Sequence, residues 1–162
     1  MHDLVETLQL SLLLRIFVGF VLGAVVGLER ERRAKAAGLR THMLVAGGSA
    51  IFTVASFALF AGEGTTRDPT RIAAQIVTGI GFLGAGAIIR SGTSVSGLTT
   101  AACIWVAAGL GMLAGTGSYA LAIASAALTV LALRLPHNWL RPKKRDFDED
   151  DPDEDDRPEV GL

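Results

Sequence analysis

Three charged or polar residues lie in or beside apolar stretches, where they could do chemistry in a membrane. Arg15 stands within the first stretch, Gln75 within the third, and Asp68 just before the third. A charge near the centre of a bilayer costs about 2.5 to 3.5 kcal/mol, so such residues pair, reach the interface or serve a function. We expect Arg15 to pair with Asp68. A snorkelling arginine and an aspartate that only caps a helix are the alternatives.

A second set of polar residues gathers near the expected helix ends on the other side of the membrane. A belt of basic anchors that touches anionic headgroups would explain it. The alternative is a polar vestibule in which Glu29 pairs with Arg40, and Thr99 and Thr100 donate hydroxyl hydrogens to a ligand or to backbone. The candidate functional residues of the whole chain are Arg15, Glu29, Arg30, Arg40, Thr41, Asp68, Gln75, Arg90 and Thr99.

The residue types that build catalytic and metal sites are scattered along the chain. His2, His42 and His137 are far apart, and Cys103 is the single cysteine. A metal site needs several such ligands together, and a nucleophile needs an adjacent base. The sequence therefore predicts no enzyme, no cofactor and no metal site, and nothing in it indicates a nucleic-acid partner.

The elements that position these residues are predicted from hydropathy. Half of the 162 residues are hydrophobic and the mean hydropathy is +0.43. About 20 apolar residues in a helix cross the hydrocarbon core of a bilayer. The predicted fold is therefore all-α, a polytopic membrane bundle of about five transmembrane helices at residues 8–28, 41–61, 72–89, 98–115 and 118–135.

The orientation follows from the basic residues in the loops. Five of them follow the first helix between Arg30 and Arg40, and four follow the fifth helix between Arg141 and Arg145. The connection between the second and third helices holds only Arg67 and Arg71. Because basic loops stay in the cytoplasm, the N-terminus is predicted outside and the C-terminus inside.

Small residues recur at spacings that favour close packing of helices. Gly19, Gly23 and Gly27 repeat every four residues in the first helix, and Gly111 belongs to a similar repeat in the fourth. Such a face lets two helix axes approach closely. In the third helix Gly79, Gly81 and Gly84 match the spacing of a dinucleotide-binding fingerprint but lack its strand-turn-helix context. We therefore predict helix packing in this stretch also, at Gly79, Gly84 and Gly86.

Charge divides the chain into two parts. Residues 1–145 hold 14 of the 15 Lys and Arg but only 6 of the 16 Asp and Glu. The remainder is acidic, poor in apolar groups and interrupted by prolines, which is typical of disorder. We predict a transmembrane domain at 1–140 and a basic, then acidic, disordered cytoplasmic tail at 141–162.

Four sequence motifs resemble those of the MgtC/SapB family of bacterial membrane proteins, also known as the MgtC/SapB/SrpB/YhiD N-terminal family. They are "GLERERR", "AGLRTHMLV", "DPTRIAAQIVTGIGFLGAGAIIR" and "SVSGLTTAACIWVAAGLG", in order over about residues 10–135. The motif positions are Glu29, Arg30, Gly38, Leu39, Arg40, Thr41, Asp68, Gln75, Gly84, Gly86 and Thr99. Two departures are Thr99, where some members have Asn, and the acidic tail, where some have a soluble C-terminal domain.

The resemblance implies a multi-pass protein of the bacterial inner membrane with a role in magnesium homeostasis, stress adaptation or virulence. It favours a non-enzymatic regulator of another membrane complex during magnesium limitation, acid stress or intracellular survival. The implied partners are the lipid bilayer, a membrane complex such as the ATP synthase, and a second copy of the chain. A channel or transporter for a cation or small solute is the alternative.

Overall fold

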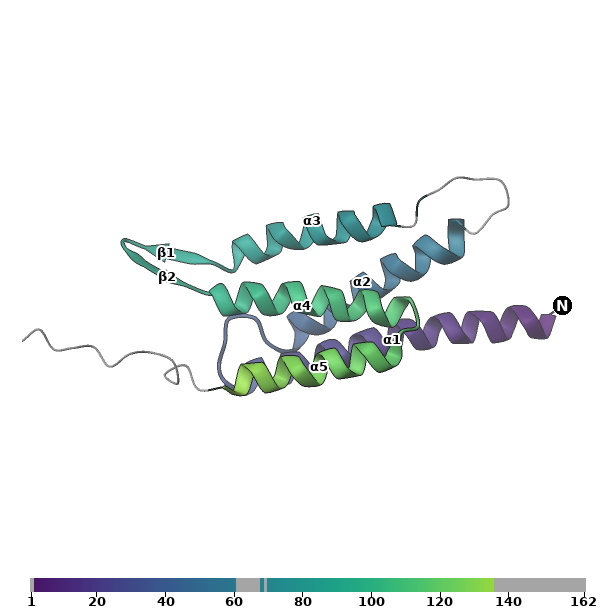
Figure 1. Ribbon diagram of the computed structural model, residues 1–162, viewed down its shortest axis with the longest axis horizontal. Helices are drawn as coiled ribbons and strands as arrows, with labels where there is room; N and C mark the ends of the chain where they lie inside the picture. The colour runs from purple at the N-terminus through teal and green to yellow at the C-terminus, as the bar shows by residue number, and fades with distance from the viewer. Residues whose placement is uncertain (1, 61–67, 69, 136–162) are drawn as a thin grey trace, which may run out of the picture.

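Five helices and one short hairpin make up the computed structural model, which describes residues 2–60, 68 and 70–135 (Figure 1). The helices are α1 (His2–Arg32), α2 (Leu39–Phe60), α3 (Thr70–Gly86), α4 (Leu98–Gly115) and α5 (Tyr119–Arg134). The prediction of a mainly helical chain is confirmed. The predicted tail at 141–162 and the connection around Gly64 lie outside the described residues.

The hairpin is the part of the fold that the all-α prediction missed. The third apolar stretch is predicted as a helix to residue 89, but α3 ends at Gly86. After it, β1 (Ile89–Ser91) pairs antiparallel with β2 (Ser94–Ser96). Gly92 supplies the positive φ of +60° that a tight turn between two strands needs. The hairpin projects at the end of the bundle opposite the N-terminus (Figure 1).

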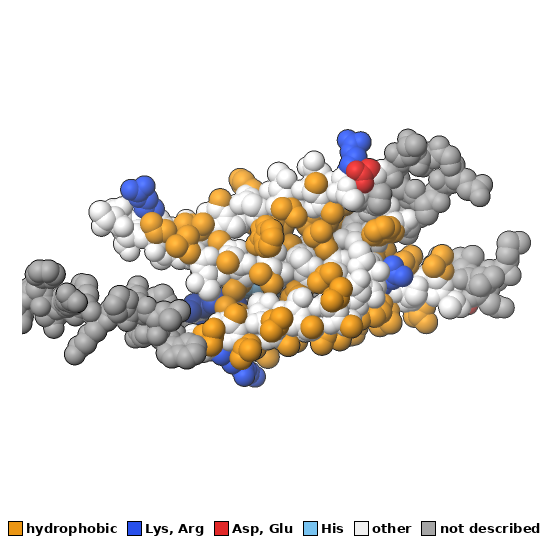
Figure 2. Space-filling view, in the orientation of Figure 1, with side chains coloured by type: hydrophobic (Ala, Val, Ile, Leu, Met, Phe, Trp, Pro, Cys, Tyr) orange, Lys and Arg blue, Asp and Glu red, His pale blue; other side chains and the backbone are white. Residues whose placement is uncertain are grey.

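Two helices of the described chain are long and apolar enough to cross a membrane, namely Glu6–Arg32 of α1 and the whole of α4. Helix α4 has the bounds that hydropathy predicted, while α1 is 31 residues long and extends beyond the predicted 8–28 at both ends. Helix α5 is apolar but shorter. Hydrophobic side chains are spread over the face of the bundle drawn in Figure 2. The exposed large hydrophobic residues include Phe17, Leu44, Phe82 and Trp105.

The core lies where α1, α2 and α4 meet, and small residues form much of it. Ala46, Ala50, Ala107 and Ala114 are fully buried. Helix α1 presents its glycines to α2. A Cβ added to Gly19 would lie 2.7 Å from the Ala50 Cβ.

The other core glycines bring backbones into direct contact. A Cβ at Gly27 would lie 2.8 Å from the Cα of Leu39, and one at Gly23 would overlap the carbonyl oxygen of His42. From the opposite side, a Cβ at Gly111 of α4 would overlap the carbonyl oxygen of Ala46. These three helices can pack at this distance only while the residues stay small.

The glycines of α3 have different surroundings. A Cβ at Gly79 or Gly86 would meet no described atom within 4 Å, and one at Gly84 would make only an ordinary contact with Ala101 at 3.8 Å. Helix α3 packs against α4 through larger side chains instead. Ile76 and Ile80 are buried in one cluster with Ile104 and Ala108.

Candidate functional site

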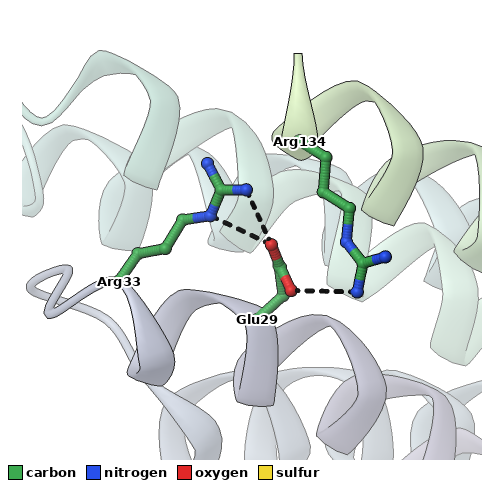
Figure 3. A network of polar contacts seen from close by, with 3 residues as sticks. All are labelled: Glu29, Arg33 and Arg134. Carbon is green, nitrogen blue, oxygen red and sulfur yellow. Dashed lines mark hydrogen bonds and ion pairs between the residues drawn. The ribbon is translucent and has the colours of Figure 1, made fainter. Parts of the chain in front are cut away.

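Glu29 forms an ion-pair network at the C-terminal end of α1 (Figure 3). Its Oε1 accepts a hydrogen bond of 2.9 Å from the Nε of Arg33, the residue just after the end of α1, and its Oε2 pairs with Arg134 at the end of α5 at 3.5 Å. The Glu29 side chain is 10% exposed. Pairing offsets the cost of burying its charge and ties α1 to α5. Arg40, the predicted partner of Glu29, is instead exposed at the start of α2.

Arg30 is the next residue but makes a different set of contacts. It is 3% exposed, and its Nη2 donates to the Thr100 Oγ1 of α4 at 2.9 Å. Its Nε has no hydrogen-bond partner, and Arg30 forms no ion pair with any described residue. The guanidinium lies within electrostatic reach of the buried His42 and Cys103. A buried cation with one neutral partner is costly, which marks this position as a candidate site.

The start of α2 is fixed by another glutamate of the same segment. The Glu31 Oε2 accepts a hydrogen bond of 2.7 Å from the backbone N–H of Leu39. This carboxylate therefore satisfies one of the free N–H groups at the N-terminus of α2. A Cβ at Gly38 would overlap the Glu31 carboxylate, so a side chain there would have to displace this cap.

An open pocket of about 790 Å³ lies between the ends of α1, α4 and α5. Basic and hydroxyl groups on one part of its wall face an apolar part contributed by β2, α4 and α5. The polar lining residues are Arg30, Arg33, Lys35, Thr99 and Thr100. The structure thus brings Arg30 and Thr99, two of the predicted functional residues, to one pocket beside Glu29.

Arg15 and Asp68 do not form the predicted pair. The Arg15 Nη1 donates to the carbonyl oxygen of Gly115, at the end of α4, over 3.4 Å. The Asp68 Oδ1 accepts from the backbone N–H of Thr70 at 2.8 Å and from its hydroxyl at 2.6 Å. These bonds hold the pKa of Asp68 below its usual value. Asp68 therefore caps the start of α3, which was the alternative to pairing with Arg15. The donors of Thr70 are only two residues away and lie within reach of its carboxylate.

The remaining candidates lie at separate places. Gln75 is exposed and lines an apolar groove of about 480 Å³ between α2 and α3. Arg90 is exposed on β1, where its Nε donates to the Gly92 carbonyl at 3.2 Å. Thr41 is exposed and lines a different pocket among α2, α3 and α4.

Sequence reasoning missed Arg134. It is the one basic residue in the last turn of α5, and it reaches Glu29 over 105 positions of sequence. The sequence feature that could have predicted its role is a single arginine at the end of an apolar stretch, because such residues anchor helix ends at the membrane interface.

The comparisons with known proteins agree on one family. The MgtC family matches residues 16–140. The chain is 44% identical over 129 residues to the "Putative magnesium transporter YhiD" of Escherichia coli (strain K12), covering 77% of this chain and 60% of that protein. It is 46% identical over 126 residues to "Protein MgtC" of Salmonella typhimurium (strain LT2), covering 77% and 52% respectively.

A third relative comes from another organism. The "Uncharacterized protein slr0014" of Synechocystis is 46% identical over 122 residues, which cover 74% of this chain and 50% of that protein. The chain thus spans between half and three fifths of the length of these relatives. No solved structure matches. With two helices that can span a bilayer and a family match over most of its length, this chain is a membrane protein and belongs to the MgtC family.

Proposed function

We propose that this chain is a multi-pass protein of the bacterial inner membrane that regulates another membrane complex by binding it, without catalysing a reaction itself. The N-terminus is outside and the C-terminus is in the cytoplasm, as the basic loops predict. The name of the E. coli relative, a putative magnesium transporter, supports a role connected with magnesium supply. The ATP synthase, which the family resemblance implies as a partner, is the first membrane complex to test for binding.

The proposal rests on two features of the bundle, a closely packed centre and a groove on its surface. Backbone contacts at Gly23, Gly27 and Gly111 bring α1 and α4 against α2. The buried side chains Leu22, Val26 and Leu110 fill this centre with apolar groups. A centre of this kind supports a rigid binding module more than a polar pathway.

The surface groove lies between α2 and α3. Leu44 and Phe52 of α2 face Ile76 and Leu83 of α3 across it, and Gln75 adds one amide to the wall. Leu44 and Phe52 are exposed, so the groove opens sideways. A transmembrane helix of a partner would fill such a groove, and the amide would give it a hydrogen bond inside the bilayer.

A magnesium transporter is the second candidate, because the name of the E. coli relative states it. The charges argue against it. Arg15 lies at one end of the bundle, and Arg30, Arg33 and Lys35 surround the pocket at the other. Positive side chains at both ends repel a divalent cation.

A photo-crosslinking residue tests the groove as the binding face. Placed at Phe52, it should yield an adduct with one membrane protein complex in bacterial membranes. Leu128 of α5 is the matched control, since the two side chains are similarly exposed at 61% and 65% but only Phe52 lines the groove. Adducts with lipid alone at Phe52, or the same protein adduct from both positions, would contradict the proposal.

A further inference from the structure

We propose that the pocket lined by Arg30, Arg33, Lys35, Thr99 and Thr100 binds a phosphate-bearing anion. This site is distinct from the groove between α2 and α3, and it does not depend on whether the chain regulates or transports. Nothing in the family match or in the names of the relatives assigns a ligand to it.

The charge of the pocket is the first argument. Its described lining carries three basic side chains, while Glu29, the carboxylate that contacts one of them, is already held by Arg33 and Arg134. Lys35 follows the end of α1 and is exposed, so its ammonium group is available to a ligand. The pocket therefore attracts an anion.

Arg30 supplies the second argument. It is nine-tenths or more buried, its Nε is without a partner, and it has no counter-charge among the described residues. Burying a guanidinium without a counter-charge costs free energy. An anion in the pocket that Arg30 lines would provide the missing negative charge. Arginine is also the side chain that best matches the oxygens of a phosphate.

The start of α4 adds neutral donors to the same wall. Gly97 is the N-cap residue of α4, with a φ of +86°, and it contributes no side-chain cap. A Cβ there would overlap the carbonyl oxygen of Ala87, so this position is restricted to glycine. The first-turn N–H groups of α4 and the hydroxyls of Thr99 and Thr100 are therefore available to an acceptor.

The ligand chemistry follows from this donor set. Guanidinium, ammonium, hydroxyl and backbone N–H groups together suit a group with several acceptor oxygens on one atom, as in a phosphate. The apolar part of the wall, which includes Val95, Leu98 and Leu133, would accommodate the glycerol and acyl portion of a phospholipid. A lipid headgroup and free phosphate share the recognition chemistry, and the experiment separates them.

The acidic run at 146–156 is a competing source of anionic oxygens. The chain continues from Leu135, which lines the pocket, towards that run. Carboxylates of the run would neutralise the same basic residues. A full-length variant with this run changed to Asn and Gln therefore belongs in the experiment.

The test uses the purified full chain in a non-ionic detergent. Native mass spectrometry measures the retention of added phosphatidylglycerol against phosphatidylcholine, and calorimetry measures the binding of inorganic phosphate. We expect selective retention of phosphatidylglycerol, with phosphate binding in addition if the free ion is a ligand. Arg30→Gln and Lys35→Gln should each weaken binding roughly tenfold, because each removes a charged donor.

Arg32→Gln is the matched control, because Arg32 is a neighbouring exposed arginine that does not line the pocket, and it should leave binding unchanged. Lys35→Gln decides the outcome if Arg30→Gln fails to fold. Equal loss in the Lys35 and Arg32 variants would show a diffuse charge effect and overturn the proposal. The proposal would also be overturned if neither phosphatidylglycerol nor phosphate bound, or if either bound only to the variant in which the 146–156 run is neutralised.

Discussion

Alanine at Gly111 should destabilise the bundle strongly, whereas alanine at Gly109 should leave its stability unchanged or slightly higher. Both glycines lie in α4, two positions apart. At Gly111 the new methyl group would overlap the carbonyl oxygen of Ala46, while at Gly109 it would meet nothing within 4 Å among the described residues. Overpacking of this kind costs about 1 to 3 kcal/mol or more, because α2 or α4 must move.

The Gly109 variant controls for the intrinsic effect of the substitution. Alanine is favoured over glycine in a helix by about 1 kcal/mol, so Gly109→Ala should be neutral or slightly stabilising. Thermal unfolding and size-exclusion elution in one detergent measure both variants. If Gly111→Ala melted at the same temperature as Gly109→Ala, the close approach of α2 and α4 would be refuted.

Valine at Thr100 should lower stability, and valine at the adjacent Thr99 should not. Valine has nearly the shape of threonine but lacks the hydroxyl oxygen. At Thr100 the change removes the acceptor of the Arg30 Nη2 hydrogen bond inside the protein, leaving a second nitrogen of that guanidinium without a partner. An unsatisfied buried donor costs about 1 to 3 kcal/mol, and more for a charged group.

Thr99 is exposed and makes the matched control for this change. Chemical or thermal unfolding in one detergent gives the difference between the two variants. Thr100→Ser restores the hydroxyl and should recover most of the loss. Equal stability of the two valine variants would mean that the contact between Arg30 and Thr100 does not hold α1 to α4.

Hydropathy predicted the helices well where apolar content alone decides their bounds. Helix α4 is the clearest case, since the residues on either side of it are polar or glycine. Helix α1 runs further, because Glu29, Glu31 and the arginines beside them are good helix formers that carry the helix past the apolar stretch. The hairpin was not predicted because Ile88 and Ile89, at the end of the predicted third helix, are apolar and suit a helix end and a strand equally.

The polar contacts were less predictable, because they depend on which helices are neighbours. Glu29 and Arg30 are adjacent in sequence, but successive helical residues point about 100° apart. One therefore reaches Arg134 of α5 and the other Thr100 of α4. Predicted depth in the membrane placed Arg15 near Asp68, but the local donors of Thr70 bind that carboxylate instead.

Magnesium flux into liposomes that contain only this purified protein tests directly whether the chain acts by binding and not by transport. A magnesium-sensitive dye inside the vesicles reports entry, with and without an imposed membrane potential. We expect the same magnesium entry as into protein-free liposomes, while an ionophore gives full entry. Saturable magnesium entry that depends on the protein, and that Gly111→Ala abolishes while Gly109→Ala preserves it, would contradict the claim.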